Sequence, residues 1–293
     1  MRPHLLIFGF GYTAHFLAQK ARKINIQITT TTRDSNALGY NREFDCDLIH
    51  FSEKSIDHAL ATASHILISI PPTPDLGDPV LVNFGNSLKK HIKNIRWIGY
   101  LSSTSVYGDH QGHWVDESSK PIAIGGQGQL RLSAENEWVS FVEAYQVPLT
   151  IFRLAGIYGP QRNVLARLIA GKSSTVVKDG QFFSRVHVED IVLAILAAMQ
   201  NPKVGITIYN VADDEPAPGH VVDEYAASLL QRPPLKRIAH EMATLSPMAK
   251  EFYSHNKCVS NAKLKRELNI QLTYPTYKEG LAHLLHNEGY LCQ

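Results

Sequence analysis

The sequence has few cysteines and no long apolar run, and both absences narrow the classes of protein it can belong to. Its three cysteines, Cys46, Cys258 and Cys292, form no Cys-x-x-Cys pair and no spacing typical of a zinc site. Isolated thiols suit a reducing compartment, so we expect a cytoplasmic protein without a bound metal. No apolar run approaches the roughly 20 residues needed to cross a bilayer, so we expect no membrane partner.

An excess of charge of one sign is also missing. The 293 residues carry a net charge of +2, with both signs scattered along the chain, which argues against a nucleic-acid partner. Hydrophobic residues make up 44% and charged residues 19%, as in ordinary globular proteins. We therefore expect a small-molecule substrate as partner, and either a monomer or a homodimer.

Short apolar runs alternate with segments of helical spacing through the first half of the chain. This alternation indicates parallel strands joined by right-handed crossovers. The sequence therefore predicts an α/β fold with a Rossmann-type, doubly wound parallel sheet. The expected strands are 4–9, 25–32, 48–51, 65–70, 96–103 and 148–154, and the expected helices are 12–22, 55–63, 80–92 and 129–145.

The pattern changes after Gly159, where the chain becomes mainly helical and richer in Pro and His. No Gly/Ser-rich or Pro-rich linker marks a boundary. We expect a dinucleotide-binding domain over 1–160, to which the chain returns at about 183–212. A smaller, mainly helical substrate lobe over 161–293 is expected to be interleaved with it.

The first expected strand leads into a glycine motif at residues 9–14. Gly9, Gly11 and Ala14 match Gly-x-Gly-x-x-Ala, with Tyr12 and Thr13 opening the helix that follows. Gly9 would allow a tight turn, Gly11 would let the pyrophosphate approach the backbone, and Ala14 would allow close helix–strand packing. The strand–turn–helix context supports this otherwise short motif.

The end of the second expected strand indicates which dinucleotide binds. An NAD site normally has Asp or Glu about 20 residues after the glycines, bound to the ribose 2′-OH. This strand instead ends in Thr32 and Arg33. A guanidinium with a neighbouring hydroxyl suits a 2′-phosphate, so the predicted cofactor is NADP(H). The alternative is that Arg33 is a solvated loop charge.

Four later segments are YLSSTSVYG (100–108), FRLAGIYGP (152–160), RVHVEDI (185–191) and YNVADDEP (209–216). Together with the motifs above, they resemble the extended short-chain dehydrogenase/reductase superfamily. Three C-terminal segments resemble an atypical subgroup that is similar to nucleotide-sugar epimerases and dehydratases: LSPMAKEFYSHNK (245–257), VSNAKLKREL (259–268) and YPTYKEGL (274–281). The resemblance implies an NAD(P) cofactor and a small carbonyl or nucleotide-sugar substrate.

The resemblance places Ser103 where the superfamily keeps its catalytic Ser or Thr, in contact with a substrate oxygen. The usual Tyr-x-x-x-Lys is missing, because no Tyr occurs from 109 to 144. Alignment puts Gln127 at the Tyr position and Arg131 at the Lys position. Gln127 cannot transfer a proton, whereas Arg131 can still bind the cofactor ribose.

Other residues are candidates for the remaining roles. His110 and Tyr107 are candidate proton-transfer groups, although a surface histidine and a packing tyrosine are the alternatives. Pro71 would end a strand beside the cofactor. Arg162 and Arg185 are candidate contacts for an anionic substrate, and either could equally be a charge paired with a carboxylate.

Two Tyr-x-x-x-Lys strings, at Tyr253…Lys257 and Tyr274…Lys278, are interpreted as chance matches because they lie far along the chain from Ser103. Two functions stay open. One is an oxidoreductase or epimerase-like enzyme with a different proton relay, which the retained Ser103 favours. The other is a non-catalytic NADP(H)-binding sensor or regulatory protein, which the missing Tyr and Lys favour.

Overall fold

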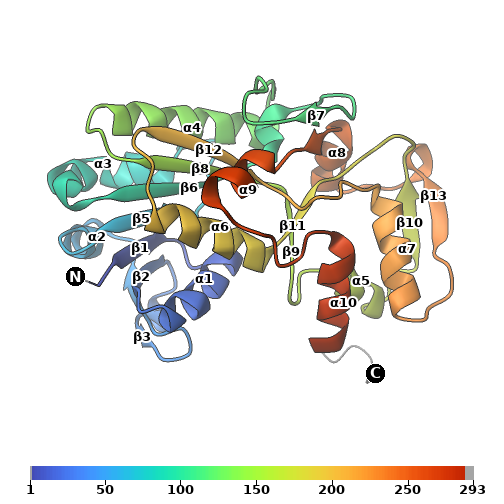
Figure 1. The fold of residues 1–293 in the computed structure, drawn as a ribbon, viewed down its shortest axis with the longest axis horizontal. Coiled ribbons are helices and arrows are strands. Elements are labelled where there is room, and N and C mark those ends of the chain that lie inside the picture. The colour runs from blue at the N-terminus through green and yellow to red at the C-terminus, as the bar shows by residue number, and fades with distance from the viewer. Residues whose placement is uncertain (1, 288–293) are drawn as a thin grey trace. The chain divides into compact units, whose positions relative to one another are not determined.

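The structure is a computed structural model that describes residues 2–287, so Cys292 lies outside the described residues. The chain forms two compact units and passes between them repeatedly (Figure 1). The domain boundaries expected from the sequence stay a prediction. The first unit comprises Met1–Ser103, Gln127–Arg153 and Val192–Tyr209, and the second comprises Thr104–Gly126, Leu154–Ile191 and Asn210–Gln293.

The first unit is built on a large sheet, whose strands within the described residues follow the order β12-β8-β6-β5-β1-β2-β4-β3. Strand β1 is paired in parallel with β2 and β5, β2 with β4, and β5 with β6. The expected Rossmann-type α/β fold is thus confirmed. The strands are β1 (His4–Phe8), β2 (Gln27–Thr32), β3 (Gly39–Asn41), β4 (Cys46–His50), β5 (His65–Ile68), β6 (Trp97–Ser103), β8 (Leu149–Leu154) and β12 (Ile206–Val211).

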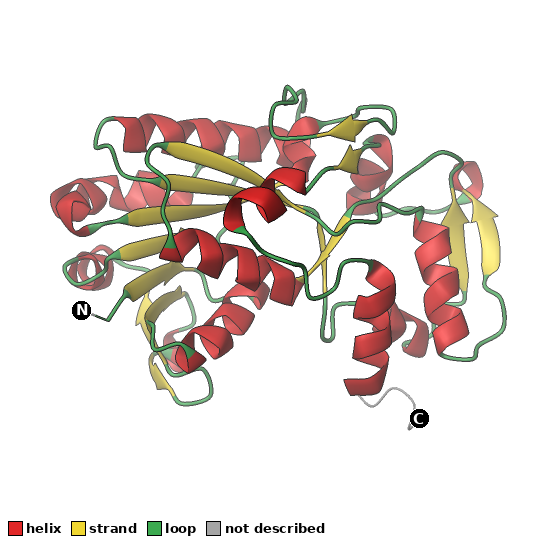
Figure 2. Ribbon diagram, viewed as in Figure 1, coloured by secondary structure: helices red, strands yellow, loops and turns green. Residues whose placement is uncertain are grey.

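Helices cover both faces of this sheet (Figure 2). Alternate strand residues such as Leu6, Ile68 and Tyr100 pack with α2, α3 and α4 in one apolar cluster. The intervening residues, such as Leu5 and Ile7, are also fully buried, and α1 and α6 lie on that side (Figure 1). Strands buried on both faces read as apolar runs, which is why the sequence revealed them. The helices are α1 (Tyr12–Lys23), α2 (Glu53–Leu60), α3 (Pro79–His91), α4 (Gly126–Glu143) and α6 (Val188–Gln200).

The second unit combines helices with short strand pairs. Helices α5, α7 and α10 share an apolar core that includes Leu165, Leu168, Ala226 and Leu281. Strand β7 is paired in parallel with β14, β9 with β11, and β10 with β13. Its elements are β7 (Trp114–Val115), β9 (Gly156–Tyr158), α5 (Val164–Ile169), β10 (Ser174–Val177), β11 (Arg185–His187), α7 (Gly219–Leu229), β13 (Lys236–Ala239), α8 (Pro247–Ser254), β14 (Cys258–Val259), α9 (Ala262–Leu268) and α10 (Tyr277–Asn287).

No helix within residues 2–287 combines the length and the hydropathy that a bilayer crossing requires. No group of three or more His, Cys, Asp or Glu side chains in this range is arranged to hold a metal ion.

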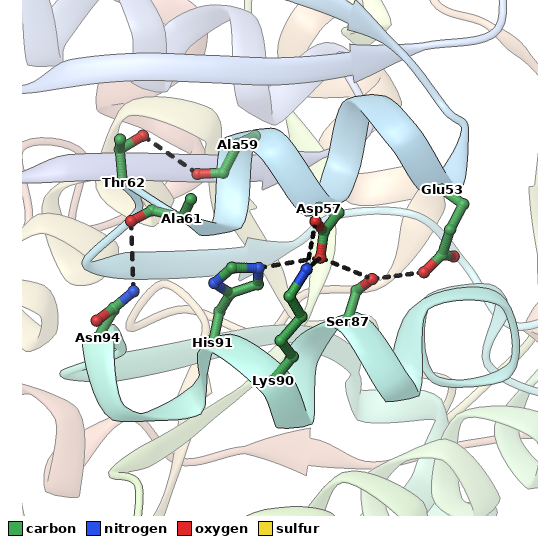
Figure 3. A network of polar contacts seen from close by, with 9 residues as sticks. All are labelled: Glu53, Asp57, Ala59, Ala61, Thr62, Ser87, Lys90, His91 and Asn94. Carbon is green, nitrogen blue, oxygen red and sulfur yellow. Dashed lines mark hydrogen bonds and ion pairs between the residues drawn. The ribbon is translucent and has the colours of Figure 1, made fainter.

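Polar side chains connect α2 to α3 on the surface of the first unit (Figure 3). The Asp57 carboxylate accepts hydrogen bonds from Lys90 Nζ at 2.8 Å and from His91 Nε2 at 2.9 Å. These two bonds hold the pKa of Asp57 below its usual range, against a weaker opposing effect of burial. Lys90 and His91 stand in the last turn of α3, where positive charge is also favoured by the helix dipole.

We expect Asp57→Asn to lower the Tm by about 1–3 °C at neutral pH, because Lys90 and His91 lose a charged acceptor. A carboxylate whose pKa is lowered by folding stabilises the protein above its unfolded pKa, and this stabilisation is lost as the pH falls through the folded pKa. The difference in Tm between the two proteins should therefore shrink below about pH 4. Thermal melts from pH 7 to pH 3.5 measure it, with Asp75→Asn in an exposed loop as the control. A difference that does not depend on pH would contradict this account.

Candidate functional site

The carboxyl ends of the central strands of the first unit meet at one edge of the sheet. Phe8 is aligned with Ile68 across the β1–β5 pair, and Ile68 with Tyr100 across the β5–β6 pair. On the other side of β1, Ile7 is aligned with Thr30. The segments that follow these strands therefore leave the sheet at the same edge, which is where open α/β sheets bind their ligands.

The turn after β1 is tightly packed around Gly9. The backbone of Gly9 has φ of +97°, a conformation that residues with a Cβ rarely adopt. A Cβ built on Gly9 would lie 2.5 Å from Cγ2 of Ile70, in the segment that follows β5. The N–H of Gly9 donates to Oγ1 of Thr31 on β2 at 2.8 Å. Three neighbouring strand ends thus hold this turn in place.

Gly11 faces open space. It precedes α1 with φ of −94°, and a Cβ built on it would meet no atom within 4 Å. Within the described part of the chain, no side chain caps the first N–H groups of α1, and its first turn has no acidic residue. The N-terminus of a helix beside open space suits an anion such as a pyrophosphate. Tyr12 and Thr13 open this helix, and Ala14 is fully buried where it packs on the sheet.

Arg33 follows the last residue of β2 directly, and its side chain is exposed. The carboxylate of the next residue, Asp34, accepts the N–H of Asn36 and so caps the short turn after it. Oγ1 of Thr32 accepts the N–H of Asp34 at 3.1 Å. Asp34 is therefore engaged in its own turn, and the guanidinium of Arg33 stands directly after the end of β2.

Ser103 and Arg131 both belong to the first unit. Ser103 is the last residue of β6 and is partly exposed. Arg131 stands on α4, and its Nη1 donates to the backbone carbonyl of Leu101, two residues before Ser103, at 2.6 Å. Pro71 is exposed in the loop that follows β5. The structure thus brings Arg131 to the end of the strand that carries Ser103.

A buried polar network lies beneath Arg131. Oγ of Ser102 donates to Oε1 of Glu135 at 2.5 Å. The same carboxylate is bound by Arg153 on β8, with Nη2 2.7 Å from Oε2 and Nε 3.2 Å from Oε1. All three side chains are almost completely buried. None of Ser102, Glu135 and Arg153 had been assigned a role from the sequence.

The second unit contains the other candidates. Tyr107 is fully buried, and its hydroxyl donates to Oδ1 of Asn210 at 2.8 Å. The backbone N–H of Asn210 in turn donates to Glu117, whose pKa is raised by burial. His110 lies close to Tyr107, with ring centroids 6.3 Å apart, and its buried Nε2 has no hydrogen-bond partner among the described residues.

The two cationic candidates differ in their surroundings. Arg162 is exposed after β9, and its backbone pairs with that of Gly159. Nη1 of Arg185 donates to the carbonyls of Phe183 and Ala217, at 2.8 and 3.0 Å. Burial raises the pKa of the neighbouring Asp213 to about 8, although the positive charge of Arg185 opposes this rise.

Lys257, the end of one Tyr-x-x-x-Lys string, lies closer to the candidate residues than its place in the chain indicates. Its Nζ donates to the carbonyl of Gly108 at 3.0 Å, and burial lowers the pKa of this amine to about 8. The N–H of Asn256 donates to Asp109, and the N–H of His110 donates to the carbonyl of Asn256. Separation along the sequence therefore does not keep this string away from Gly108 and His110, and its interpretation as a chance match stays a prediction.

A parallel sheet with a glycine turn at its carboxyl edge that leads directly into the first helix is characteristic of a Rossmann-type NAD(P)-binding fold. Residues 86–212 match the NAD dependent epimerase/dehydratase family. The chain is 31% identical to Protein YeeZ of Escherichia coli over 282 residues, which cover 92% of this chain and 95% of that protein. The chain belongs to the NAD dependent epimerase/dehydratase family.

Solved structures share the fold of this chain. A functionally unknown conserved protein from Silicibacter pomeroyi is 40% identical, with a TM-score of 0.89 over 97% of this chain and 99% of that chain. The dTDP-glucose 4,6-dehydratase from Bacillus anthracis, solved in complex with NAD, is 16% identical and shares the fold. Its TM-score is 0.77, over 98% of each chain.

We predict opposite effects when Gly9 and Gly11 are each replaced by valine. The Tm of Gly11→Val should stay within about 2 °C of the wild-type value, because the φ of Gly11 and the open space beside it accept a side chain. It should weaken binding of NADPH at least about tenfold, because the new side chain fills the pyrophosphate position. Gly9→Val, the matched control, should destabilise the fold itself. Thermal melts and cofactor titration measure both effects, and unchanged affinity in a folded Gly11→Val would remove Gly11 from the site.

Proposed function

We propose that the chain is an NADP(H)-binding oxidoreductase or epimerase-like enzyme that acts on a small carbonyl compound or a nucleotide sugar. The observation that carries the cofactor assignment is the exposed Arg33 at the end of β2, next to an Asp34 that caps its own turn. An exposed guanidinium is suited to bind a 2′-phosphate through charge-assisted hydrogen bonds. Thr32, at the end of the same strand, adds a hydroxyl.

In this proposal, NADP(H) supplies or accepts a hydride when it is bound, and the protein supplies binding and orientation. Gly9, Gly11, Tyr12, Thr13 and Ala14 form the turn and the helix start that hold the pyrophosphate. Pro71 stiffens the neighbouring loop after β5. Arg131 binds ribose hydroxyls. The exposed Arg162 and the more buried Arg185 are proposed to contact an anionic part of the substrate.

Ser103 is proposed to hydrogen-bond the reacting oxygen of the substrate, and His110 or Tyr107 to move the proton. We favour His110, because the hydroxyl proton of Tyr107 is engaged with Asn210. The buried Nε2 of His110 is compatible with this role. A nucleotide sugar is supported by the name of the B. anthracis protein that shares the fold, a dTDP-glucose dehydratase.

A second function, a non-catalytic NADP(H)-binding sensor, is favoured by Gln127 and Arg131. They stand on α4 where the superfamily alignment expects Tyr and Lys. Gln127 offers no acid or base at neutral pH. Turnover of any substrate would exclude this second function.

The cofactor preference tests the first part of the proposal. NADPH should bind more tightly than NADH by about 1.5–3 kcal/mol, the value of charge-assisted hydrogen bonds to the 2′-phosphate. Arg33→Asp should abolish or reverse this preference. Lys23→Asp, which makes the same change in charge at the exposed end of α1, should leave it intact. Fluorescence titration of each protein with NADPH and with NADH measures the two affinities. Equal affinities in the wild type would refute the assignment of NADP(H).

The role of Ser103 tests the second part. With a true substrate, Ser103→Ala should lower turnover at least about tenfold while cofactor affinity stays nearly constant, because this hydroxyl would contact the substrate. Ser140→Ala, an exposed serine on the same unit, is the control. The assay follows NADPH absorbance across carbonyl compounds and nucleotide sugars, and product analysis accompanies it because epimerases recycle their cofactor. Equal turnover of wild type and Ser103→Ala would show that the assignment is wrong.

A further inference from the structure

The N-terminal end of helix α4 is rich in glycine and therefore contributes little to the stability of the helix. Gly125 and Gly126 both have positive φ, of +71° and +58°, and Gly128 follows in the first turn. Glycine is a weak helix former, because it loses the most backbone freedom when it is ordered. The position of Arg131, one turn further on, therefore depends on contacts that α4 makes with the sheet.

These contacts come from two consecutive residues of β6. Nη1 of Arg131 donates to the carbonyl of Leu101, and Oγ of Ser102 donates to the carboxylate of Glu135. Arg131 and Glu135 are four residues apart, so they lie one above the other on the same face of α4. The strand thus holds the helix at two successive turns.

Glu135 is fixed from a second strand as well. Arg153 of β8 grips its carboxylate with Nε and Nη2, and only 4% and 3% of the Arg153 and Glu135 side chains are exposed. A paired guanidinium and carboxylate fix both direction and distance, because the planar groups match. Ser102, Glu135 and Arg153 therefore join β6, β8 and α4 at a fixed position directly beside Arg131.

We propose that Ser102, Glu135 and Arg153 are positioning residues of the cofactor site, which set the affinity for NADP(H) by holding the turn of α4 that carries Arg131. This inference rests on the proposed function, since it takes Arg131 to bind the cofactor ribose. The buried Glu135–Arg153 ion pair then has a role in positioning Arg131, whereas a buried ion pair by itself is weak evidence for added stability. None of the three residues needs to contact the cofactor.

The experiment measures the coupling between Ser102 and Arg131. Ser102→Ala removes one hydrogen bond and leaves the ion pair intact, so it is a milder change than any substitution of Glu135 or Arg153. The proteins compared are wild type, Ser102→Ala, Arg131→Ala and the double variant. Affinity for NADPH is measured by fluorescence titration, and a thermal melt of each protein checks that it is folded.

Ser102→Ala should raise the Kd for NADPH about three- to tenfold in the wild-type background, in the range of coupling seen within hydrogen-bond networks. In the Arg131→Ala background the same change should raise it less than about twofold, because the residue through which Ser102 acts is gone. Ser102→Thr, which keeps the hydroxyl, should restore affinity toward the wild-type value.

Thr150→Ala is the matched control. Thr150 is a buried hydroxyl on β8 that accepts a hydrogen bond from Trp97 Nε1 at 2.9 Å, within the same sheet. Its loss should lower the Tm as the loss of Ser102 does, yet leave the Kd for NADPH unchanged. A merely structural role of Ser102 would make the two variants behave alike.

The outcomes separate this inference from the function on which it rests. If the wild type binds neither NADPH nor NADP+, the proposed function fails. If the wild type binds NADPH, the inference is overturned by any of three results: Ser102→Ala leaves the Kd unchanged, Arg131→Ala leaves it unchanged, or the two effects simply multiply in the double variant. In each of those cases the cofactor assignment stands.

Discussion

The buried ion pair between Glu135 and Arg153 is the constraint on which the arrangement of the first unit depends most. An isolated charge in a protein interior costs several kcal/mol, so neither side chain can be buried there without the other. Because one stands on α4 and the other on β8, the helix and the strand must come together in a single register. Ser102 then adds β6 to the same contact. The ion pair and the Ser102 hydrogen bond thus specify how α4 lies against β6 and β8. Apolar packing alone would define this arrangement less narrowly.

This ion pair lies near the carboxyl ends of β6 and β8, at the edge of the sheet where we propose the cofactor site. The edge of the sheet beside Ser102 also carries the end of β1, with Gly9 and Gly11, and the end of β2, with Arg33. Buried side chains favour the parallel arrangement of these strands, since each strand is buried on both faces. Parallel neighbours bring their carboxyl ends together regardless of where they stand in the sequence. Packing therefore determines the location of the site, whereas a few polar residues determine its contents.

The same distinction explains what could be predicted from the sequence. The strands 4–9 and 65–70 were found as β1 and β5 because double-sided burial leaves an apolar run. Strand β3, which is antiparallel to β4, was missed because Gly39–Asn41 is mostly exposed and has no such run. The glycine motif was recognisable because the turn that it forms depends on local backbone conformation.

Side chains that pair across the fold leave no comparable signal. The partners of Glu135 are Ser102 and Arg153, which lie 33 and 18 residues away in the sequence. No spacing rule connects these three positions. Lys257 was set aside as distant for the same reason, although it contacts Gly108. The roles of Ser103, His110, Tyr107, Arg162 and Arg185 stay predictions, because position in the fold does not by itself define chemistry.

The replacement of the superfamily lysine by Arg131 fits anchoring better than proton transfer. A lysine beside a tyrosine can stabilise a tyrosinate, and its own pKa is readily shifted by burial. Arginine stays charged at every physiological pH, and position 127 provides no phenol for it to act upon. Its planar fork, however, carries five N–H donors. One of them is used at the carbonyl of Leu101, and such a guanidinium can bind a strand end and ribose hydroxyls at once, which a single ammonium does less well. In the proposed function, Arg131 therefore keeps only one of the two tasks that the lysine combines. It anchors the cofactor ribose on α4, whereas position 127 offers no tyrosine whose pKa could be lowered, so any proton transfer has to come from another group.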